Sequence, residues 1–128
     1  MDIAEHLLYT KEHEWINIDG NEATIGISDY AQESLGDITF IELPEVGDEV
    51  EQFEEFVSLE SVKAASDIFA PMSGEIIAVN DDLADHPGLI NKSPYDKGWI
   101  ARIKISDPEE HSNLMTAEEY GKFLESIG

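Results

Sequence analysis

Lys63 is the residue whose type and setting point most directly to chemistry. It is the only lysine or arginine between Lys11 and Lys92, and it lies in the segment Glu60–Asp67 between two strand-like stretches. A lysine at the tip of a tight turn exposes its amine to a modifying enzyme, and small neighbours such as Ser61 and Ala64 leave room for that enzyme. An ordinary solvated lysine would look the same, because short motifs give false positives. The flanking sequence has to decide between the two interpretations.

The elements around Lys63 indicate a mainly β chain. Turn signals and alternating apolar residues predict strands at 13–18, 23–27, 38–43, 49–53, 55–59, 68–70, 75–80 and 98–105. A short helix fits residues 29–35, with Asp29 as its N-cap and Gly36 as its end. We therefore expect a small β-sandwich or barrel with helical additions.

The end of the chain changes character. Asp107-Pro108 is a good helix start, and Thr116 with Glu119 forms a capping box that opens a helix. Tyr120 and Leu124 fall on one face of that helix, which we expect to pack on the domain. At 128 residues the chain predicts one domain, 1-128, with a core of about 22-105 and a C-terminal helical segment of about 107-127.

Two segments that flank Lys63 share a pattern of proline and glycine positions. Each of 43–50 and 70–77 has an apolar residue, a proline, two further residues, a glycine and then the start of a strand. The pattern is consistent with two related half-sheets that place Lys63 on the hairpin between them. A coincidence of proline turns explains it equally well.

Composition restricts the function classes. The chain has 29 acidic against 7 basic residues and a net charge of -22, which disfavours nucleic acids and anionic membranes as partners. Proteins with basic docking faces suit such a surface, although the charge could also serve solubility alone. No apolar run approaches the length of a membrane span, and the start has no secretory signal. We expect a bacterial cytoplasmic protein, or a mitochondrial matrix protein if a presequence was removed.

The sequence lacks the residue patterns of common catalytic and metal sites. With no cysteine, the chain has no disulfide, thiolate zinc site or cysteine nucleophile, so dithiol chemistry would need an added cofactor. The four histidines lack metal-ligand spacing, and no nucleophile elbow, phosphate loop or dinucleotide fingerprint occurs. The acidic segment 81–85 is interpreted as a solvated turn rather than a calcium loop. We predict neither catalytic residues nor a metal site, and no enzyme activity.

Five motifs, in order along the chain, resemble the H proteins of the glycine cleavage system. They are His13-Glu14-Trp15, Gly26-Ile27-Ser28-Asp29-Tyr30-Ala31-Gln32, Glu42-Leu43-Pro44, Glu60-Ser61-Val62-Lys63-Ala64 and Gly98-Trp99. The resemblance covers almost the whole chain. It implies a lipoyl/biotinyl-type flattened sandwich of two small antiparallel sheets, with short helices and a C-terminal helix.

The resemblance also implies what the chain does. Lys63 would carry lipoate as an amide and act as a swinging arm for one-carbon chemistry. The partners would be a pyridoxal-phosphate glycine decarboxylase (P protein), a tetrahydrofolate-dependent aminomethyltransferase (T protein) and dihydrolipoamide dehydrogenase (L protein). A lipoate ligase, or an octanoyl/lipoyl transferase, would attach the group. The H protein would be a monomeric carrier and not a catalyst.

In the family, two acids hold the loaded arm, and this chain keeps them as Glu14 and Asp67. Their carboxylates would stabilise the cationic amine on the arm, and a cleft would exclude water. The chain departs from the pattern at Ser34, where some members have histidine, and at Glu12, where some have serine. Those departures affect the finer polar contacts of the pocket.

Other carriers and classes fit less well. Lipoyl domains of 2-oxoacid dehydrogenases usually have aspartate before the lysine, and biotin carriers have methionine on both sides, whereas Lys63 lies between Val62 and Ala64. An H-like protein that relays lipoate to 2-oxoacid dehydrogenases would have the same modification site. A purely structural acidic adaptor would tolerate Lys63→Arg.

Overall fold

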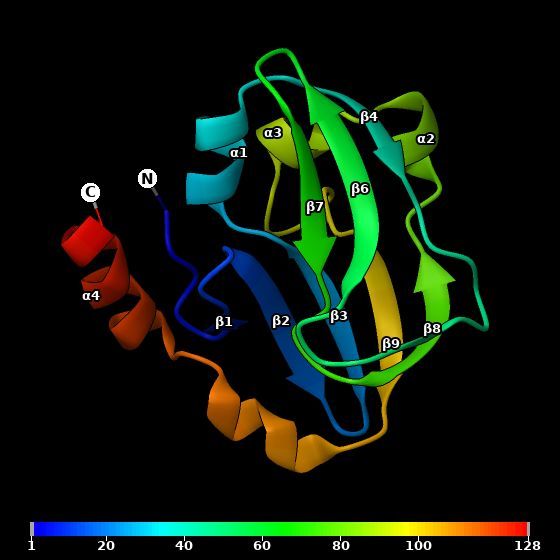
Figure 1. Cartoon of the computed structure of the whole chain (residues 1–128), viewed down its shortest axis with the longest axis vertical. Coiled ribbons are helices and arrows are strands. Elements are labelled where there is room, and N and C mark those ends of the chain that lie inside the picture. Colours follow the sequence, from blue (N-terminus) through cyan, green and yellow to red (C-terminus); the bar gives the residue numbers. More distant parts are fainter. Residues whose placement is uncertain (1, 128) are drawn as a thin grey trace.

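The β6–β7 hairpin, at the top of Figure 1, belongs to the smaller of two antiparallel sheets. The computed structural model describes residues 2–127. The smaller sheet has the strand order β4 (Ile38–Glu42), β6 (Glu55–Ser61) and β7 (Ala65–Phe69). The larger sheet has the order β1 (Leu8–Tyr9), β2 (Glu14–Asp19), β3 (Glu22–Ile27), β9 (Ala101–Ile105), β8 (Gly74–Val79) and β5 (Glu49–Val50). The expected mainly β sandwich of two antiparallel sheets is confirmed.

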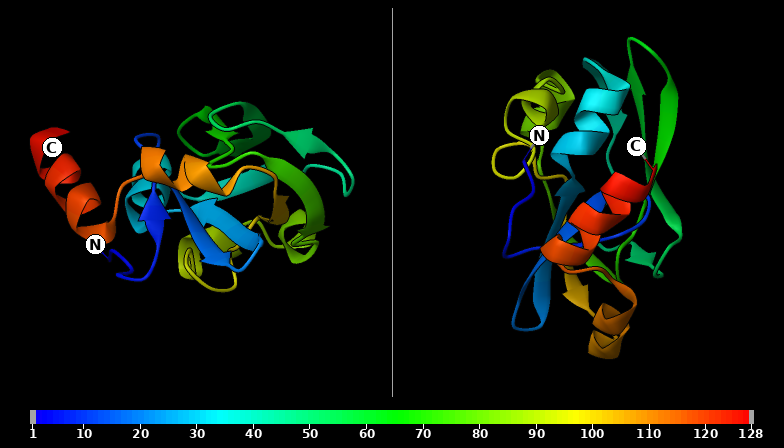
Figure 2. Two further views of the ribbon diagram at one scale, coloured as in Figure 1. Left: turned by 90° about the horizontal axis from the view of Figure 1, so that it is seen from below. Right: turned by 90° about the vertical axis from the view of Figure 1, so that its left-hand side faces the viewer.

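Helices flank this sandwich, some near the β6–β7 hairpin and others away from it (Figures 1 and 2). They are α1 (Asp29–Leu35), α2 (Asp82–Asp85), α3 (Leu89–Lys92), the 3₁₀ helix η1 (Pro108–Asn113) and α4 (Ala117–Ile127). The termini of the described chain lie on the side where α4 projects, away from the tip of the β6–β7 hairpin.

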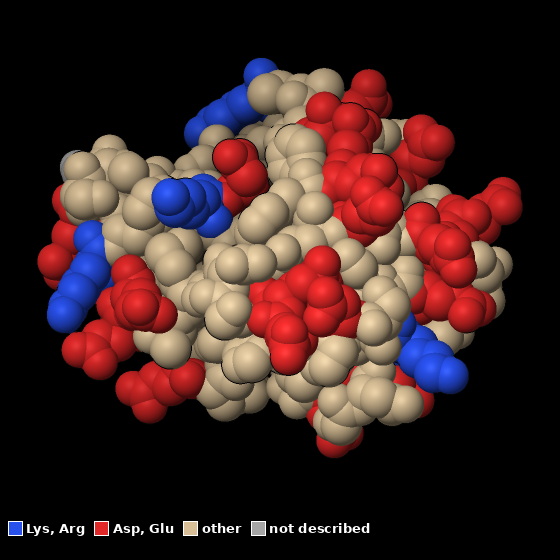
Figure 3. All heavy atoms as spheres, turned by 60° about the horizontal axis from the view of Figure 1, so that its bottom comes forward, with Lys and Arg blue, Asp and Glu red and all other residues tan. Residues whose placement is uncertain are grey.

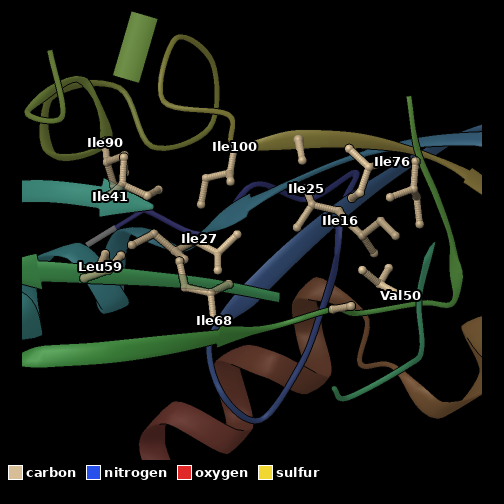
Figure 4. Packing of buried hydrophobic residues seen from close by; sticks show 14 of the residues in the cluster. Ile16, Ile25, Ile27, Ile41, Val50, Leu59, Ile68, Ile76, Ile90 and Ile100 are labelled. Atoms are coloured by element: carbon tan, nitrogen blue, oxygen red, sulfur yellow. The ribbon is translucent and has the colours of Figure 1, made fainter. Parts of the chain in front are cut away.

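Strand alternation builds the core between the sheets. Ile16, Ile25 and Ile76 from the larger sheet face Leu59 and Ile68 from the smaller one, and all five side chains are buried (Figure 4). Leu83 of α2 and Ile90 of α3 join the same cluster. Burying one such side chain stabilises the fold by roughly 1.5–3 kcal/mol. The two packed sheets support the β6–β7 hairpin, whose tip extends beyond them.

A second apolar cluster attaches α4. Tyr120 is fully buried and stacks on Tyr9 with ring centroids 4.3 Å apart, while Leu124 packs partly buried beside them. The helix begins with the expected capping box, in which Thr116 N–H donates to Glu119 at 2.8 Å and Glu119 N–H donates to the Thr116 hydroxyl at 3.2 Å. The expected packing of this helix is confirmed. Trp15 is buried, whereas Trp99 is only partly buried.

Several local expectations were wrong. The N-cap of α1 is Ser28 and not Asp29: the Ser28 hydroxyl accepts from Ala31 N–H at 3.2 Å. The predicted strand 49–53 ends at Val50, because the chain turns and Phe53 adopts a left-handed backbone with φ of 65°. The acidic segment 81–85 contains the helix α2, since burial of Leu83 gives it an apolar anchor. Helix α3 was not predicted.

The two segments with a shared proline and glycine pattern, 43–50 and 70–77, pair with one another. Glu49 pairs with Glu75 and Val50 with Gly74 in an antiparallel register, and Gly47 N–H donates to Ile76 O at 2.8 Å. A Cβ at Gly74 would lie 2.3 Å from Lys104 O of the neighbouring strand β9, so the close approach of β8 and β9 here needs glycine.

Candidate lipoyl-attachment site

Lys63 lies at the tip of the β6–β7 hairpin with its side chain exposed. Ser61 closes the turn: its N–H donates to Ala64 O at 2.8 Å, and its hydroxyl accepts from the N–H groups of Lys63 and Ala64 at 3.3 and 3.2 Å. Among residues 2–127 the two salt bridges are Arg102–Glu22 and Lys122–Glu118, so neither occupies the Lys63 amine. The turn chemistry therefore presents an accessible amine.

Gly36, at the end of α1, lies against this lysine. Its φ is 75°, and a Cβ at this position would be 3.4 Å from Lys63 Cε and 3.3 Å from Val62 Cγ2. The carbonyl of Asp37 accepts from Val62 N–H at 3.0 Å. The lysine methylenes thus rest beside a glycine while the amine stays outside. This arrangement suits a long acyl chain attached to the amine.

Glu14 begins β2 and is almost fully buried, with 1% of its surface exposed. Its carboxylate accepts from the Thr10 hydroxyl and from Phe69 N–H, the latter at 3.2 Å. Burial raises the pKa of Glu14 to about 7, with a smaller contribution from repulsion by Glu12, although both hydrogen bonds act in the opposite direction. A carboxyl of this kind exchanges a proton near neutral pH.

Asp67 is exposed on β7, on the face opposite the buried Ile68. It lines a shallow groove of about 270 Å³ with Phe40 and Glu60. A hydrogen bond and repulsion from Asp67 raise the pKa of the Glu55 carboxyl. Two acids therefore meet at this point with no cation from the described chain between them.

Glu14 and Asp67 are both located at β7, but in different ways. Glu14 reaches the free edge of β7 through Phe69, while Asp67 lies two residues along and faces outward. No hydrogen bond joins the two carboxyl groups within residues 2–127. Glu12 and Ser34 are both exposed.

A cavity adjoins the hydrogen-bond partners of Glu14. Its volume is about 400 Å³, and it is lined by Tyr9, Thr10, Lys11, Glu12, Phe53, Phe69, Asn113 and Met115. Thr10 and Phe69 thus contact both the buried carboxylate and this largely apolar space. The combination offers a sheltered place next to an ionisable group.

Comparisons with known proteins agree along the length of the chain. The family model described as glycine cleavage H-protein matches residues 7–127. The glycine cleavage system H protein of Halothermothrix orenii is 50% identical over 99% of both chains, and H protein 2 of Arabidopsis thaliana, a mitochondrial protein, is 49% identical over 96% of this chain and 79% of that one. The crystal structure of an H protein from Mycobacterium marinum superposes with a TM-score of 0.86, at 39% identity and with 94% of this chain covered and 97% of that one.

The chain belongs to the glycine cleavage H-protein family. Membership confirms the resemblance and the lipoyl-carrier function that it implied. It also separates this H protein from 2-oxoacid dehydrogenase lipoyl domains and biotin carriers.

Sequence reasoning missed several parts of this H-protein site. Thr10 carried no signal, because a threonine four residues before a glutamate is common and only the fold makes it a donor to Glu14. Gly36 was interpreted only as a helix end, yet it also borders Lys63. The His13 of the His-Glu-Trp motif links the site to α4, with its Nδ1 2.9 Å from the Tyr120 hydroxyl and its pKa lowered by burial.

Carboxylates are also common on the surface away from the lysine hairpin. Figure 3 shows carboxylates distributed over one face with few lysines or arginines among them.

None of the helices within residues 2–127 combines the length and the apolar character needed to cross a membrane. In the same part of the chain, no three acidic or histidine side chains are grouped as metal ligands.

Proposed function

We propose that Lys63 carries the lipoyl group of this H protein, joined to its amine as an amide. The observation that carries the proposal is the exposed, unpaired amine at the tip of a rigid hairpin, with the lysine methylenes beside Gly36. When attached, the lipoyl group would supply a disulfide/dithiol couple able to carry a one-carbon unit and a pair of electrons. The chain itself tethers and presents the group, which raises its effective concentration at each partner.

The partners follow from the same function. The carrier would dock in turn on glycine decarboxylase, aminomethyltransferase and dihydrolipoamide dehydrogenase, and a lipoate ligase or an octanoyl/lipoyl transferase would modify it beforehand. Basic faces on these enzymes would complement the net charge of -22. We propose a monomer with no chemistry of its own, in a bacterial cytoplasm or, after removal of a presequence, a mitochondrial matrix. No comparison favours the alternative of a lipoate relay, and reconstituted glycine cleavage would distinguish it.

Glu14 and Asp67 are proposed to hold the loaded arm near β7. The charged form of Glu14 would attract a cationic amine, and Thr10 and Phe69 N–H orient its carboxylate. The apolar cavity beside these two residues would limit access of water. The exposed Asp67, paired with Glu55, would contribute negative charge at the outer face of the strand.

Mass mapping of the modified protein tests the attachment. After reaction of the full chain with lipoate ligase, lipoate and ATP, we expect one lipoyl group, on Lys63. Lys63→Arg should fold with an unchanged melting temperature and accept none. Label on Lys92, Lys97 or Lys104 would show that the hairpin is not the attachment point.

Retention of the loaded arm tests the two acids. Glu14→Gln and Asp67→Asn keep the side-chain shape and remove charge, so the arm should lose its group to water faster while lipoylation of the empty carrier stays near the wild-type rate. For the buried Glu14, sheltered charge-assisted contacts are worth about 1.5–3 kcal/mol, which predicts a rate increase of about tenfold or more. Because Asp67 is exposed, solvent screens its charge and Asp67→Asn should have the smaller effect. Formaldehyde release from the double variant at the wild-type rate would remove both acids from the site.

A further inference from the structure

Asn91, in α3, has a polar side chain that the carrier function described so far does not use. Its Oδ1 accepts from Ile38 N–H at 2.9 Å, and its Nδ2 donates to Gly36 O at 2.8 Å and to Gln32 Oε1 at 3.0 Å. Each contact pairs a donor with an acceptor, so one amide orientation satisfies all three. One side chain thus holds both ends of the three-residue segment 36–38.

That segment supports the tip of the lysine hairpin. Asp37, between the two residues that Asn91 holds, accepts from Val62 N–H at 3.0 Å. Gly36 borders the methylenes of Lys63. As a glycine with φ of 75°, Gly36 would give the segment high backbone freedom if nothing restrained it. Asn91 supplies the restraint from an element far away in the sequence.

We propose that Asn91 is a positioning residue for acylation of Lys63: it fixes segment 36–38, and this segment fixes the turn that the modifying enzyme must bind. The proposal rests on the proposed attachment of lipoate to Lys63. In that reaction the neutral lysine amine displaces AMP from an activated lipoyl carboxylate, forms the amide bond and releases a proton. Asn91 contacts none of the reacting atoms and acts only on the shape of the turn.

The predicted kinetic effect is therefore on binding. In an Asn91 variant the turn would be mobile in the free carrier and would have to become ordered when the enzyme binds it. This ordering weakens affinity without changing the chemical step. We expect Asn91→Ala to raise the KM of lipoate ligase for the full-length carrier by about five- to tenfold, since each hydrogen bond lost corresponds to about a fivefold change in an equilibrium constant. The kcat should change by less than about twofold.

Asn91→Asp is the second variant. It keeps an acceptor for Ile38 N–H but presents an oxygen to Gly36 O and Gln32 Oε1, where the amide donated. We expect a similar rise in KM, and this variant serves as the test if Asn91→Ala does not fold.

Gln52→Ala is the matched control. Gln52 also makes two donor contacts to carbonyls, those of Pro71 and Glu110 at 3.0 Å, and accepts from Asn113 Nδ2 at 3.0 Å. It precedes β6, at the end of that strand opposite Lys63. This variant should lose a comparable amount of stability in thermal unfolding while its KM in the ligase assay stays at the wild-type value.

Amide hydrogen exchange gives a readout that general destabilisation would not produce. Val62 N–H is bonded to Asp37 O, whereas the neighbouring Ser61 N–H is bonded within the turn to Ala64 O. In the Asn91 variants, exchange at Val62 should accelerate several-fold relative to Ser61, and in Gln52→Ala the ratio should not move.

Two results would overturn the positioning role. One is a wild-type KM in both Asn91 variants, and the other is an equal rise in KM in Gln52→Ala. Failure of the attachment proposal would look different: the wild-type protein would then carry its label on a lysine other than Lys63.

Discussion

At the scale of one residue, the buried carboxyl of Glu14 affects both the stability of the fold and the chemistry of the site. It accepts hydrogen bonds from the Thr10 hydroxyl and from the otherwise free edge N–H of Phe69, and burial raises its pKa from the ordinary value of 4.5 to about 7. Because the folded protein binds this proton more tightly than the unfolded chain, the stabilisation is complete below about pH 4.5 and is lost as the pH rises through about 7. The same group would favour a cationic arm only once it has ionised.

Glu14→Gln should remove this pH dependence. The difference in free energy of unfolding between wild type and variant should move in favour of the variant by up to about 3 kcal/mol between pH 4.5 and pH 8, because folding raises the pKa of Glu14 from 4.5 to about 7. Urea unfolding across this range measures it, with Glu33→Gln on the exposed face of α1 as the control. Parallel pH profiles for wild type and Glu14→Gln would mean that Glu14 ionises freely in the folded protein.

At the scale of elements, short helices hold the hairpin in place. Helix α3 carries Asn91 against the end of α1, and Gly98 of the Gly98-Trp99 motif packs against the backbone of α3. A Cβ at Gly98 would lie 2.8 Å from Ile90 Cα, 2.8 Å from Ser93 O and 2.9 Å from Leu89 O, all backbone atoms. The glycine of this motif is therefore required for close packing.

Gly98→Ala should displace α3 and destabilise the protein. We expect a loss of about 1–3 kcal/mol in the free energy of unfolding, as for other overpacked sites. Gly88→Ala is the control, because open space surrounds that position, and it should change stability by less than about 0.5 kcal/mol. Denaturant titration compares the two variants. Equal effects would show that the backbone of α3 yields to a methyl group at no cost.

At the scale of the whole molecule, the net charge of -22 sets the long-range field. Clusters of carboxylates are spread over the surface in Figure 3, and the groove along the β4–β6–β7 sheet adds Glu42, Glu60 and Asp67. Complementary fields accelerate encounter, and salt screens exposed charges beyond about 8 Å at physiological ionic strength. An acidic carrier that visits several enzymes in turn gains from fast association.

Raising salt should lower the association rate with glycine decarboxylase more than it raises the dissociation rate. The double variant Glu42→Gln/Glu60→Gln should associate more slowly than Asp19→Asn/Glu125→Gln, which changes the net charge equally at exposed positions on the β2–β3 hairpin and on α4. Stopped-flow measurements over a salt series test both expectations. A flat association rate would leave the charge with a role in solubility only.

The sequence by itself determined the parts that local physical chemistry controls. Turn residues and alternation placed Lys63 on a hairpin between β6 and β7, and Thr116 with Glu119 marked the start of α4, because a turn and a capping box involve residues a few positions apart. The five motifs identified the family and, through it, the sandwich.

Only the tertiary structure decided how distant segments meet. It inserted β9 between β3 and β8, divided the strands into sheets of six and three, and brought Thr10 and Phe69 to Glu14 and Asn91 to Gly36. It also chose Ser28 over Asp29 as the cap of α1, since the Ser28 hydroxyl bonds Tyr120 at 2.7 Å as well as Ala31 N–H. Apart from the Thr10–Glu14 and Ser28–Ala31 bonds, these choices depend on packing and hydrogen bonds between residues tens of positions apart, which no local pattern encodes.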